Sequence, residues 1–279
     1  MHTLELNEIV RMFTVTDLKQ KRLFLLDMDG TIYLDDDLFD GTLDFLQYVR
    51  SVGGRYMFLT NNSSKSVDKY IEKLARLGIS ATKEDFLTST NATIVHLKQK
   101  NYKKIYAFGT MTFKQQLAEA DLPITDKLED DIDCLCMGFD TELTFQKLED
   151  ACILLGRGVD YIATNPDWVC PTWYGSVPDC GSVSQMLFNA TKRMPVFIGK
   201  PQSAMVDLAL AESGYAPEMA AIIGDRLYTD VACGINAGIS AIFVLSGEGT
   251  LEDLKTSDVQ PTHIYENIKA LYQDLVSEL

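Results

Sequence analysis

The stretch LFLLDMDGTIYLDDD, residues 23–37, places two aspartates directly after four apolar residues, and three more aspartates after a second short apolar run. An unbroken apolar run that ends in an acid is typical of a strand buried on both faces in a parallel sheet. Gly30 allows the chain to turn sharply behind Asp27 and Asp29. The sequence therefore predicts a buried strand whose carboxyl end carries the first two aspartates. The acids at 35–37 are expected on a solvated turn.

Three further apolar runs end in a polar residue in the same way: RYMFLT at Thr60, PVFIGK at Lys200 and AAIIGD at Asp225. Segments with a helical apolar stripe lie between the runs, as at residues 66–78. This repetition of strand and helix predicts an α/β fold with a doubly wound, mostly parallel sheet. Since ligands bind beyond the carboxyl ends of the strands in such sheets, the four strand ends are expected to converge on one site.

The interval between Asn62 and Lys200 is far longer than the roughly 30 residues of one β-α-β unit. Within it, residues 101–180 alternate strand-like and helix-like runs of their own. We therefore expect a core formed by residues 1–100 and 181–279, with residues 101–180 inserted as an α/β cap domain. An insertion whose two ends lie beside a site is placed to act as a lid.

Composition and charge exclude several other classes of protein. The chain has 279 residues, of which 46% are hydrophobic, and a formal net charge of −15. Because no block of Lys and Arg stands out, neither nucleic acid nor an anionic membrane is expected as a partner. No apolar stretch is long enough to span a bilayer, and residues 1–22 lack the pattern of an export signal. The protein is therefore expected in the cytoplasm, with its six cysteines as free thiols.

The candidate chemistry depends on carboxylates and a lysine, because the sequence contains no P-loop, no Gly-x-Ser-x-Gly and no His-Glu-x-x-His motif. Carboxylates that approach one another raise each other's pKa unless a cation lies between them. Asp27, Asp29 and Asp225 are therefore candidate ligands of a hard cation, for which Mg²⁺ fits the number of ligands. With the Thr60 hydroxyl and the Lys200 ammonium nearby, this arrangement is suited to binding a phosphoryl group.

Four short segments resemble, in order and spacing, the four motifs of the haloacid dehalogenase-like (HAD) hydrolases. They are DMDGT at 27–31, TNN at 60–62, KP at 200–201, and GD at 224–225 followed by Asp230. The long interval between the second and third motifs resembles the subfamily IIA enzymes, the NagD-like and p-nitrophenylphosphatase type. This resemblance implies a Rossmann-like core with an inserted α/β cap.

The resemblance also implies a role for each matching position. Asp27 would be the nucleophile that forms an aspartyl-phosphate, and Asp29 the general acid and base. Mg²⁺ would be held by the carboxylates of Asp27 and Asp225 and by the backbone carbonyl of Asp29. Asp230 would orient the lysine or a metal-bound water. The residues that would bind the phosphoryl group are Thr60, Asn61, Asn62 and Lys200.

Substrate choice would be made in the cap, where Asn165, Asp167 and Trp168 follow a predicted strand. These three are either specificity residues or residues of the core and of a turn. Relatives with such caps often pair, which implies a homodimer through the cap.

The function expected from the resemblance is Mg²⁺-dependent hydrolysis of small phosphate monoesters, such as sugar phosphates, nucleoside monophosphates or aryl phosphates. Two alternatives remain open at this stage. One is a phosphotransferase or phosphomutase that uses the same aspartyl-phosphate, and the other is a non-catalytic protein that binds a phosphorylated ligand.

Overall fold

The structure, a computed structural model, describes residues 17–172 and 174–277. In these residues the chain forms two compact units: the first comprises 17–59, 71–87 and 200–277, and the second comprises 60–70 and 88–199. The expectation about an export signal concerns residues 1–22, of which residues 1–16 lie outside the described part of the chain. None of the described helices has the length and apolar character needed to cross a membrane.

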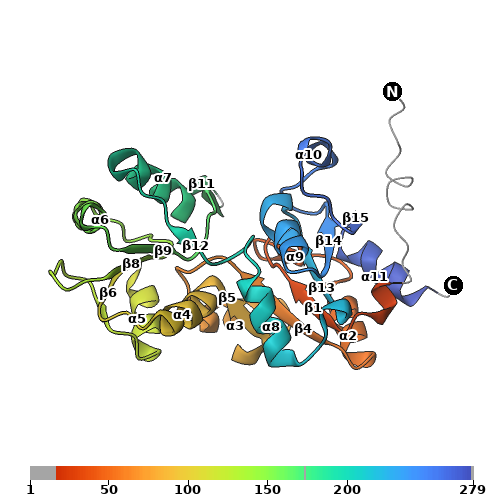
Figure 1. The fold of residues 1–279 in the computed structure, drawn as a ribbon. Helices are drawn as coiled ribbons and strands as arrows, with labels where there is room; N and C mark the ends of the chain where they lie inside the picture. Colours follow the sequence, from red (N-terminus) through yellow and green to blue (C-terminus); the bar gives the residue numbers. More distant parts are fainter. Residues whose placement is uncertain (1–16, 173, 278–279) are drawn as a thin grey trace. The chain divides into compact units, whose positions relative to one another are not determined.

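The first unit is built around a six-stranded sheet with the order β15-β14-β13-β1-β4-β5 (Figure 1). Its strands are β1 (Leu23–Leu26), β4 (Arg55–Thr60), β5 (Phe86–Thr88), β13 (Ala220–Gly224), β14 (Ser240–Val244) and β15 (His263–Tyr265). Strand β1 pairs in parallel with β4 on one side and with β13 on the other, and the pairs β13-β14 and β14-β15 are also parallel. The chain builds outward from β1 to β5 and then returns to β13 on the other side of β1, so the doubly wound prediction is confirmed.

Burial explains why the central strands could be read from the sequence. All four residues of β1 and all five of β13 are buried. The helices that connect the strands of this sheet are α2 (Thr42–Ser51), α3 (Val67–Arg76), α8 (Ala204–Ser213), α9 (Ala232–Asn236) and α10 (Leu251–Thr256), and α11 (Ile268–Val276) follows the last strand. Helix α9 lies close against β13 and β14, since a Cβ at Gly234 would come within 2.4 Å of the Ile222 side chain.

A small antiparallel hairpin follows the acidic turn after β1. It consists of β2 (Tyr33–Leu34) and β3 (Asp37–Leu38). Asp35 has a φ of 48° at its tip, a left-handed conformation that Asp tolerates better than most residues. The three aspartates at 35–37 are exposed, which confirms the prediction of a solvated turn.

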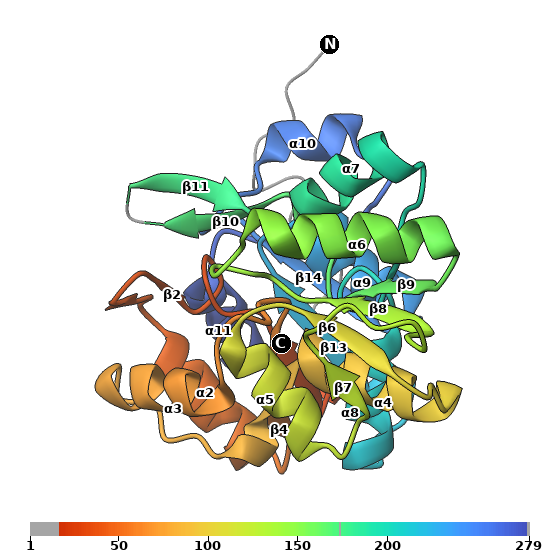
Figure 2. The same ribbon diagram turned by 90° about the vertical axis from the view of Figure 1, so that its left-hand side faces the viewer.

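The second unit contains a five-stranded parallel sheet with the order β12-β9-β8-β6-β7. Its strands are β6 (Ile105–Phe108), β7 (Ile124–Thr125), β8 (Cys134–Met137), β9 (Asp160–Ala163) and β12 (Val196–Phe197), and an antiparallel hairpin of β10 (Val169–Thr172) and β11 (Gly175–Pro178) is added. The helices are α4 (Ser89–Lys100), α5 (Met111–Glu119), α6 (Phe145–Arg157) and α7 (Cys180–Thr191). Figures 1 and 2 show α6 and α7 on one face of this sheet and α4 and α5 on the other. A buried apolar cluster joins α6 and α7 to the sheet.

The division between the units differs from the boundary expected at 101–180. Residues 88–100, which include α4, belong to the second unit, as do residues 181–199. Helix α7 stays there because Cys180, Val183 and Leu187 join the apolar cluster of that unit. Strand β12 pairs with β9, so the run PVFIGK does not add a strand to the first sheet as its sequence had suggested.

Candidate active site

The candidate site lies at the carboxyl ends of β1 and β13, where the strand order of the first sheet reverses. Asp27 follows β1 directly, and its backbone N–H donates to the carbonyl of Ile223 at 2.9 Å. Asp225 follows β13, the strand that pairs with β1. Such a reversal point is where ligands bind in open α/β sheets.

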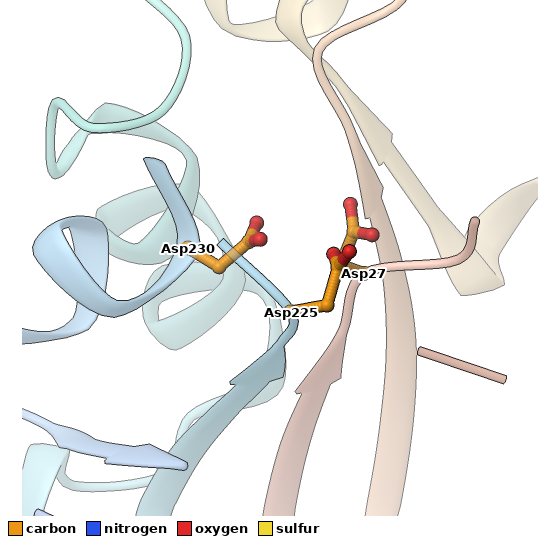
Figure 3. A group of neighbouring side chains, drawn as sticks. All are labelled: Asp27, Asp225 and Asp230. Atoms are coloured by element: carbon orange, nitrogen blue, oxygen red, sulfur yellow. The ribbon is translucent and has the colours of Figure 1, made fainter. Parts of the chain in front are cut away.

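A third carboxylate reaches the same place from the turn after β13. One turn of π-helix, Leu227–Val231, brings Asp230 back over the strand, and the Asp230 side chain accepts a hydrogen bond from the Arg226 N–H at 3.2 Å. Each of Asp27, Asp225 and Asp230 offers one oxygen, and these oxygens lie within 4.8 Å of one another. We call these three residues the carboxylate cluster; Figure 3 shows their side chains gathered from the separate segments.

Lys200 is the cation that meets this cluster. Its ammonium nitrogen lies 2.6 Å from Asp27 Oδ1 and 2.6 Å from Asp230 Oδ1, and it also donates to the carbonyl of Leu59 at 3.4 Å. Lys200 is 2% exposed. Burial by itself opposes the charged form, but the attraction of Asp230 and Asp27 outweighs it and raises the pKa of Lys200. The lysine therefore stays protonated and holds two of the three carboxylates.

The remaining electrostatics favour a bound divalent cation. Burial raises the pKa of Asp27 well above its usual value, with repulsion from Asp230 and Asp225 adding to the effect of burial against the attraction of Lys200. Burial, with repulsion from Asp230, raises the pKa of Asp225 to about 6. Lys200 is hydrogen-bonded to Asp27 and Asp230, two of the three carboxylates.

Asp225 supplies a separate indication of the same kind. Its Oδ2 accepts the Glu248 N–H at 2.7 Å, whereas its buried Oδ1 has no hydrogen-bond partner among the described residues. A buried carboxylate oxygen without a donor is costly unless a cation reaches it. Oxygen ligands are those that Mg²⁺ prefers. The donor set therefore fits a hard divalent cation.

Asp29 lies outside the carboxylate cluster. The chain turns at Gly30, whose φ is +83°, and the Asp29 side chain is 63% exposed. Its Oδ1 lies 3.7 Å from the ammonium of Lys73, which also stacks 3.8 Å from the centre of the buried Tyr33 ring. The side chains that meet are thus those of Asp27, Asp225 and Asp230, whereas the sequence had paired the first two with Asp29. The catalytic role of Asp29 stays a prediction.

Thr60 and Asn62 take part in local hydrogen bonds after β4. The buried Thr60 ends that strand, and its hydroxyl accepts the Asn62 N–H at 3.2 Å. Asn62 Oδ1 in turn accepts from the Ser64 N–H at 2.9 Å and from its hydroxyl at 2.8 Å. These bonds fix the backbone after the strand, and phosphoryl binding by this segment stays a prediction.

Three of the other predicted residues, Asn61, Asn165 and Asp167, meet inside the second unit. With Asp179 they form a buried group that we call the amide network. Asn61 Nδ2 and Asn165 Nδ2 both donate to Asp167 Oδ2, each at 2.7 Å. Asn165 Nδ2 also donates to Asp179 Oδ1 at 3.2 Å. Trp168, by contrast, is 54% exposed. Of the three predicted specificity residues, Asn165 and Asp167 therefore hold each other in the interior, and only Trp168 presents its side chain to solvent.

Sequence reasoning missed Asp179, which caps α7 by accepting the Cys180 N–H at 2.5 Å. An acid directly before a helical pattern is the signal that could have identified it. Burial raises the pKa of Asp179 to about 6, and repulsion from Asp167 adds to this, while the hydrogen bonds from Cys180 and Asn165 act in the opposite direction.

The chain matches two family models, one described as haloacid dehalogenase-like hydrolase over residues 24–123 and one as HAD-hydrolase-like over residues 197–271. The acid sugar phosphatase of Staphylococcus haemolyticus is 32% identical over 259 residues, which cover 92% of this chain and 98% of that protein.

Solved structures agree with this match. The 4-nitrophenylphosphatase of Thermotoga maritima is 40% identical with a TM-score of 0.86, covering 92% of this chain and 98% of that one. The glycerol phosphate phosphatase of Mycobacterium tuberculosis, solved in complex with magnesium, is 30% identical with a TM-score of 0.85, covering 92% of this chain and 78% of that one. The chain therefore belongs to the haloacid dehalogenase-like hydrolases, and within them to the NagD-like phosphomonoesterases of subfamily IIA.

Proposed function

We propose that this protein hydrolyses phosphate monoesters of small metabolites, in a Mg²⁺-dependent reaction that passes through an aspartyl-phosphate on Asp27. The observation that carries the proposal is the position of Asp27, held 2.6 Å from Lys200 and grouped with Asp225 and Asp230 at the reversal of the sheet. The relatives named above act on sugar phosphate, glycerol phosphate and 4-nitrophenyl phosphate. Sugar phosphates, nucleoside monophosphates and aryl phosphates are therefore the substrate range that we propose.

The carboxylates of Asp27 and Asp225, with the backbone carbonyl of Asp29, would hold the metal. Bound there, Mg²⁺ would supply positive charge that offsets the repulsion between the carboxylates and stabilises charge on the phosphoryl oxygens. Asp225 Oδ1, for which the described part of the chain supplies no hydrogen-bond partner, supports this assignment.

In the first step, a carboxylate oxygen of Asp27 attacks phosphorus. The new bond from this oxygen to phosphorus forms as the bond from phosphorus to the ester oxygen breaks. Asp29, whose side chain is exposed, donates a proton to the departing ester oxygen, which leaves as the alcohol. In the second step Asp29 takes a proton from water, and the water oxygen bonds to phosphorus as the bond from the Asp27 oxygen to phosphorus breaks. Inorganic phosphate leaves, and the Asp27 carboxylate is restored.

Lys200 would bind a phosphoryl oxygen while it keeps Asp27 in place. Asp230 is a positioning residue in this scheme, because its Oδ1 lies 2.6 Å from the same ammonium. Thr60 and the backbone of Asn61 and Asn62 would provide further donors to the phosphoryl group.

The test is a panel of phosphate esters at saturating Mg²⁺, ranked by kcat/KM from the release of inorganic phosphate. We expect hydrolysis of 4-nitrophenyl phosphate and of at least one sugar phosphate, with activity lost on chelation by EDTA and restored by Mg²⁺. Transfer of the phosphoryl group to a sugar acceptor in preference to water would instead identify a phosphotransferase. No turnover across the panel would contradict a catalytic role.

A further inference from the structure

A loop after β14 makes hydrogen bonds to Asp225 that have no part in the proposed reaction. Residues Ser246–Gly249 follow β14, and we call them the 246–249 loop. The Glu248 N–H donates to Asp225 Oδ2 at 2.7 Å, and the Gly249 N–H donates to the Asp225 carbonyl at 3.0 Å. The loop therefore holds both the side chain and the backbone of a candidate metal ligand.

The same loop is attached to the turn that follows the nucleophile. The Ser246 hydroxyl donates to the carbonyl of Gly30 at 2.7 Å. A Cβ at Gly247 would lie 2.0 Å from Asp225 Oδ2, and a Cβ at Gly30 would lie 2.4 Å from it. Since real Cβ atoms do not approach so closely, the carboxylate is packed between two glycines and has little freedom to rotate.

The Glu248 side chain closes the arrangement. Its carboxylate lies 2.9 Å from Nε of Arg226, the residue directly after Asp225, and the Tyr228 hydroxyl donates to its Oε1 at 3.4 Å. The backbone N–H of Arg226 in turn donates to Asp230 Oδ2 at 3.2 Å. One exposed glutamate therefore ties the loop to the segment that supplies two of the three clustered carboxylates.

We propose that the 246–249 loop positions Asp225 for cation binding, with Glu248 as the residue that holds the loop in place. The Glu248 N–H occupies Oδ2, so that Oδ1, which has no hydrogen-bond partner among the described residues, is the oxygen presented to the metal. Hydrogen bonds to the second oxygen of a ligating carboxylate fix its orientation and raise metal affinity. This inference rests on the proposed function, since it concerns the same metal.

The experiment measures binding of Mg²⁺ alone to the full chain by titration calorimetry, with no substrate present. Glu248→Ala removes the ion pair with Arg226 and should weaken Mg²⁺ binding about 3- to 10-fold. The effect is moderate because the ion pair is partly exposed, but the loop that it holds donates a hydrogen bond directly to the metal ligand Asp225. Glu248→Gln keeps a polar side chain of the same length beside the Arg226 guanidinium and should lose less. The matched control is Glu252→Ala, since Glu252 pairs with Lys255 on α10 and should leave the affinity unchanged.

Gly247→Ala is the stronger variant, because the added Cβ must displace Asp225 Oδ2. We expect Mg²⁺ affinity to fall by at least about tenfold. Thermal unfolding without Mg²⁺ verifies that each variant is folded. For Glu248→Ala, kcat on 4-nitrophenyl phosphate should return to the wild-type value at saturating Mg²⁺, which a general loss of structure would not allow.

The results distinguish an error in this inference from an error in the proposed function. If the wild type binds Mg²⁺ and Glu248→Ala and Gly247→Ala, both folded, bind it equally well, the loop does not position Asp225 and the inference is wrong. If the wild type itself binds no Mg²⁺, the metal in the proposed function is wrong and the inference is overturned with it.

Discussion

The carboxylate cluster of the first unit and the amide network of the second occupy similar positions in their sheets, but their buried acids are stabilised in different ways. Each lies beyond the carboxyl ends of buried parallel strands, and each buries acidic side chains. In the amide network both carboxylates accept hydrogen bonds from Asn165. In the carboxylate cluster the acids face one another around one ammonium, and Asp225 Oδ1 has no hydrogen-bond partner among the described residues.

The hydrogen-bond partners of the buried acids distinguish a structural polar group from a reactive one. A buried carboxylate that already accepts hydrogen bonds from neutral donors gains less from a cation. Carboxylates that repel each other, one of them with an oxygen that accepts no hydrogen bond, are stabilised when a cation binds. We therefore expect the first group to respond to Mg²⁺ and phosphate esters and the second to affect folding alone.

The largest expected effect is on turnover, through Asp27→Asn. The amide is a far weaker nucleophile than the carboxylate, so kcat on 4-nitrophenyl phosphate should fall by at least about a thousandfold. Mg²⁺ binding should weaken as well, because one negative ligand is lost. The same change at the exposed Asp36 is the control and should leave turnover unaltered. Activity of more than a small percentage in Asp27→Asn would rule out this residue as the nucleophile.

Next in size is the loss of the buried ammonium in Lys200→Met. This change leaves two carboxylates of the cluster without their cation, and such broken buried pairs typically cost about 3–5 kcal/mol. Urea unfolding without Mg²⁺ should show this loss, and added Mg²⁺ should recover part of it. Lys255→Met, at an exposed lysine paired with Glu252, should change stability little. An unchanged free energy of unfolding in Lys200→Met would mean that the lysine does not hold the cluster.

How much of the two units can be predicted from the sequence depends on how completely each strand is buried. Strands β1 and β13 are buried along their whole length, so their unbroken apolar runs and the acids after them can be read directly. The run PVFIGK looks the same, yet only Val196–Phe197 form a strand, and it joins the other sheet. An apolar run shows that a strand is buried but not which sheet it joins.

The candidate site shows the same limit at the level of side chains. Asp230 reaches the carboxylate cluster through a π-helical turn, a feature that hydrophobic periodicity does not reveal. Asp29 leaves the cluster because the turn at Gly30 ends the extended conformation. The residue types at the site could be predicted, whereas the directions of their side chains depend on local turns.

Asn165→Ala tests whether the amide network of the second unit contributes to stability independently of Mg²⁺. The substitution takes a donor from Asp167 and from Asp179, and hydrogen bonds to charged groups contribute about 1.5–3 kcal/mol each. We expect a loss of about 3–6 kcal/mol in urea unfolding that Mg²⁺ does not recover, with faster hydrogen exchange in α7. Asn189→Ala on the exposed side of α7 serves as the control. Recovery of Asn165→Ala by Mg²⁺ would contradict the contrast between the two groups.

The smallest expected effect is a dependence of stability on pH that comes from Asp179. Its pKa is raised to about 6 in the folded protein, against 3.8 for an ordinary Asp. Between about pH 4 and pH 6 the folded state therefore keeps a proton that the unfolded chain releases, so this group lowers the free energy of unfolding as the pH rises through that window. Each pKa unit corresponds to about 1.4 kcal/mol, so the total should lie near 1–3 kcal/mol. Asp179→Asn keeps a capping side chain and should remove this slope, which urea unfolding at pH 4, 5, 6 and 7 would measure against the wild type. If the two proteins show parallel profiles across the window, the proton is not held at Asp179.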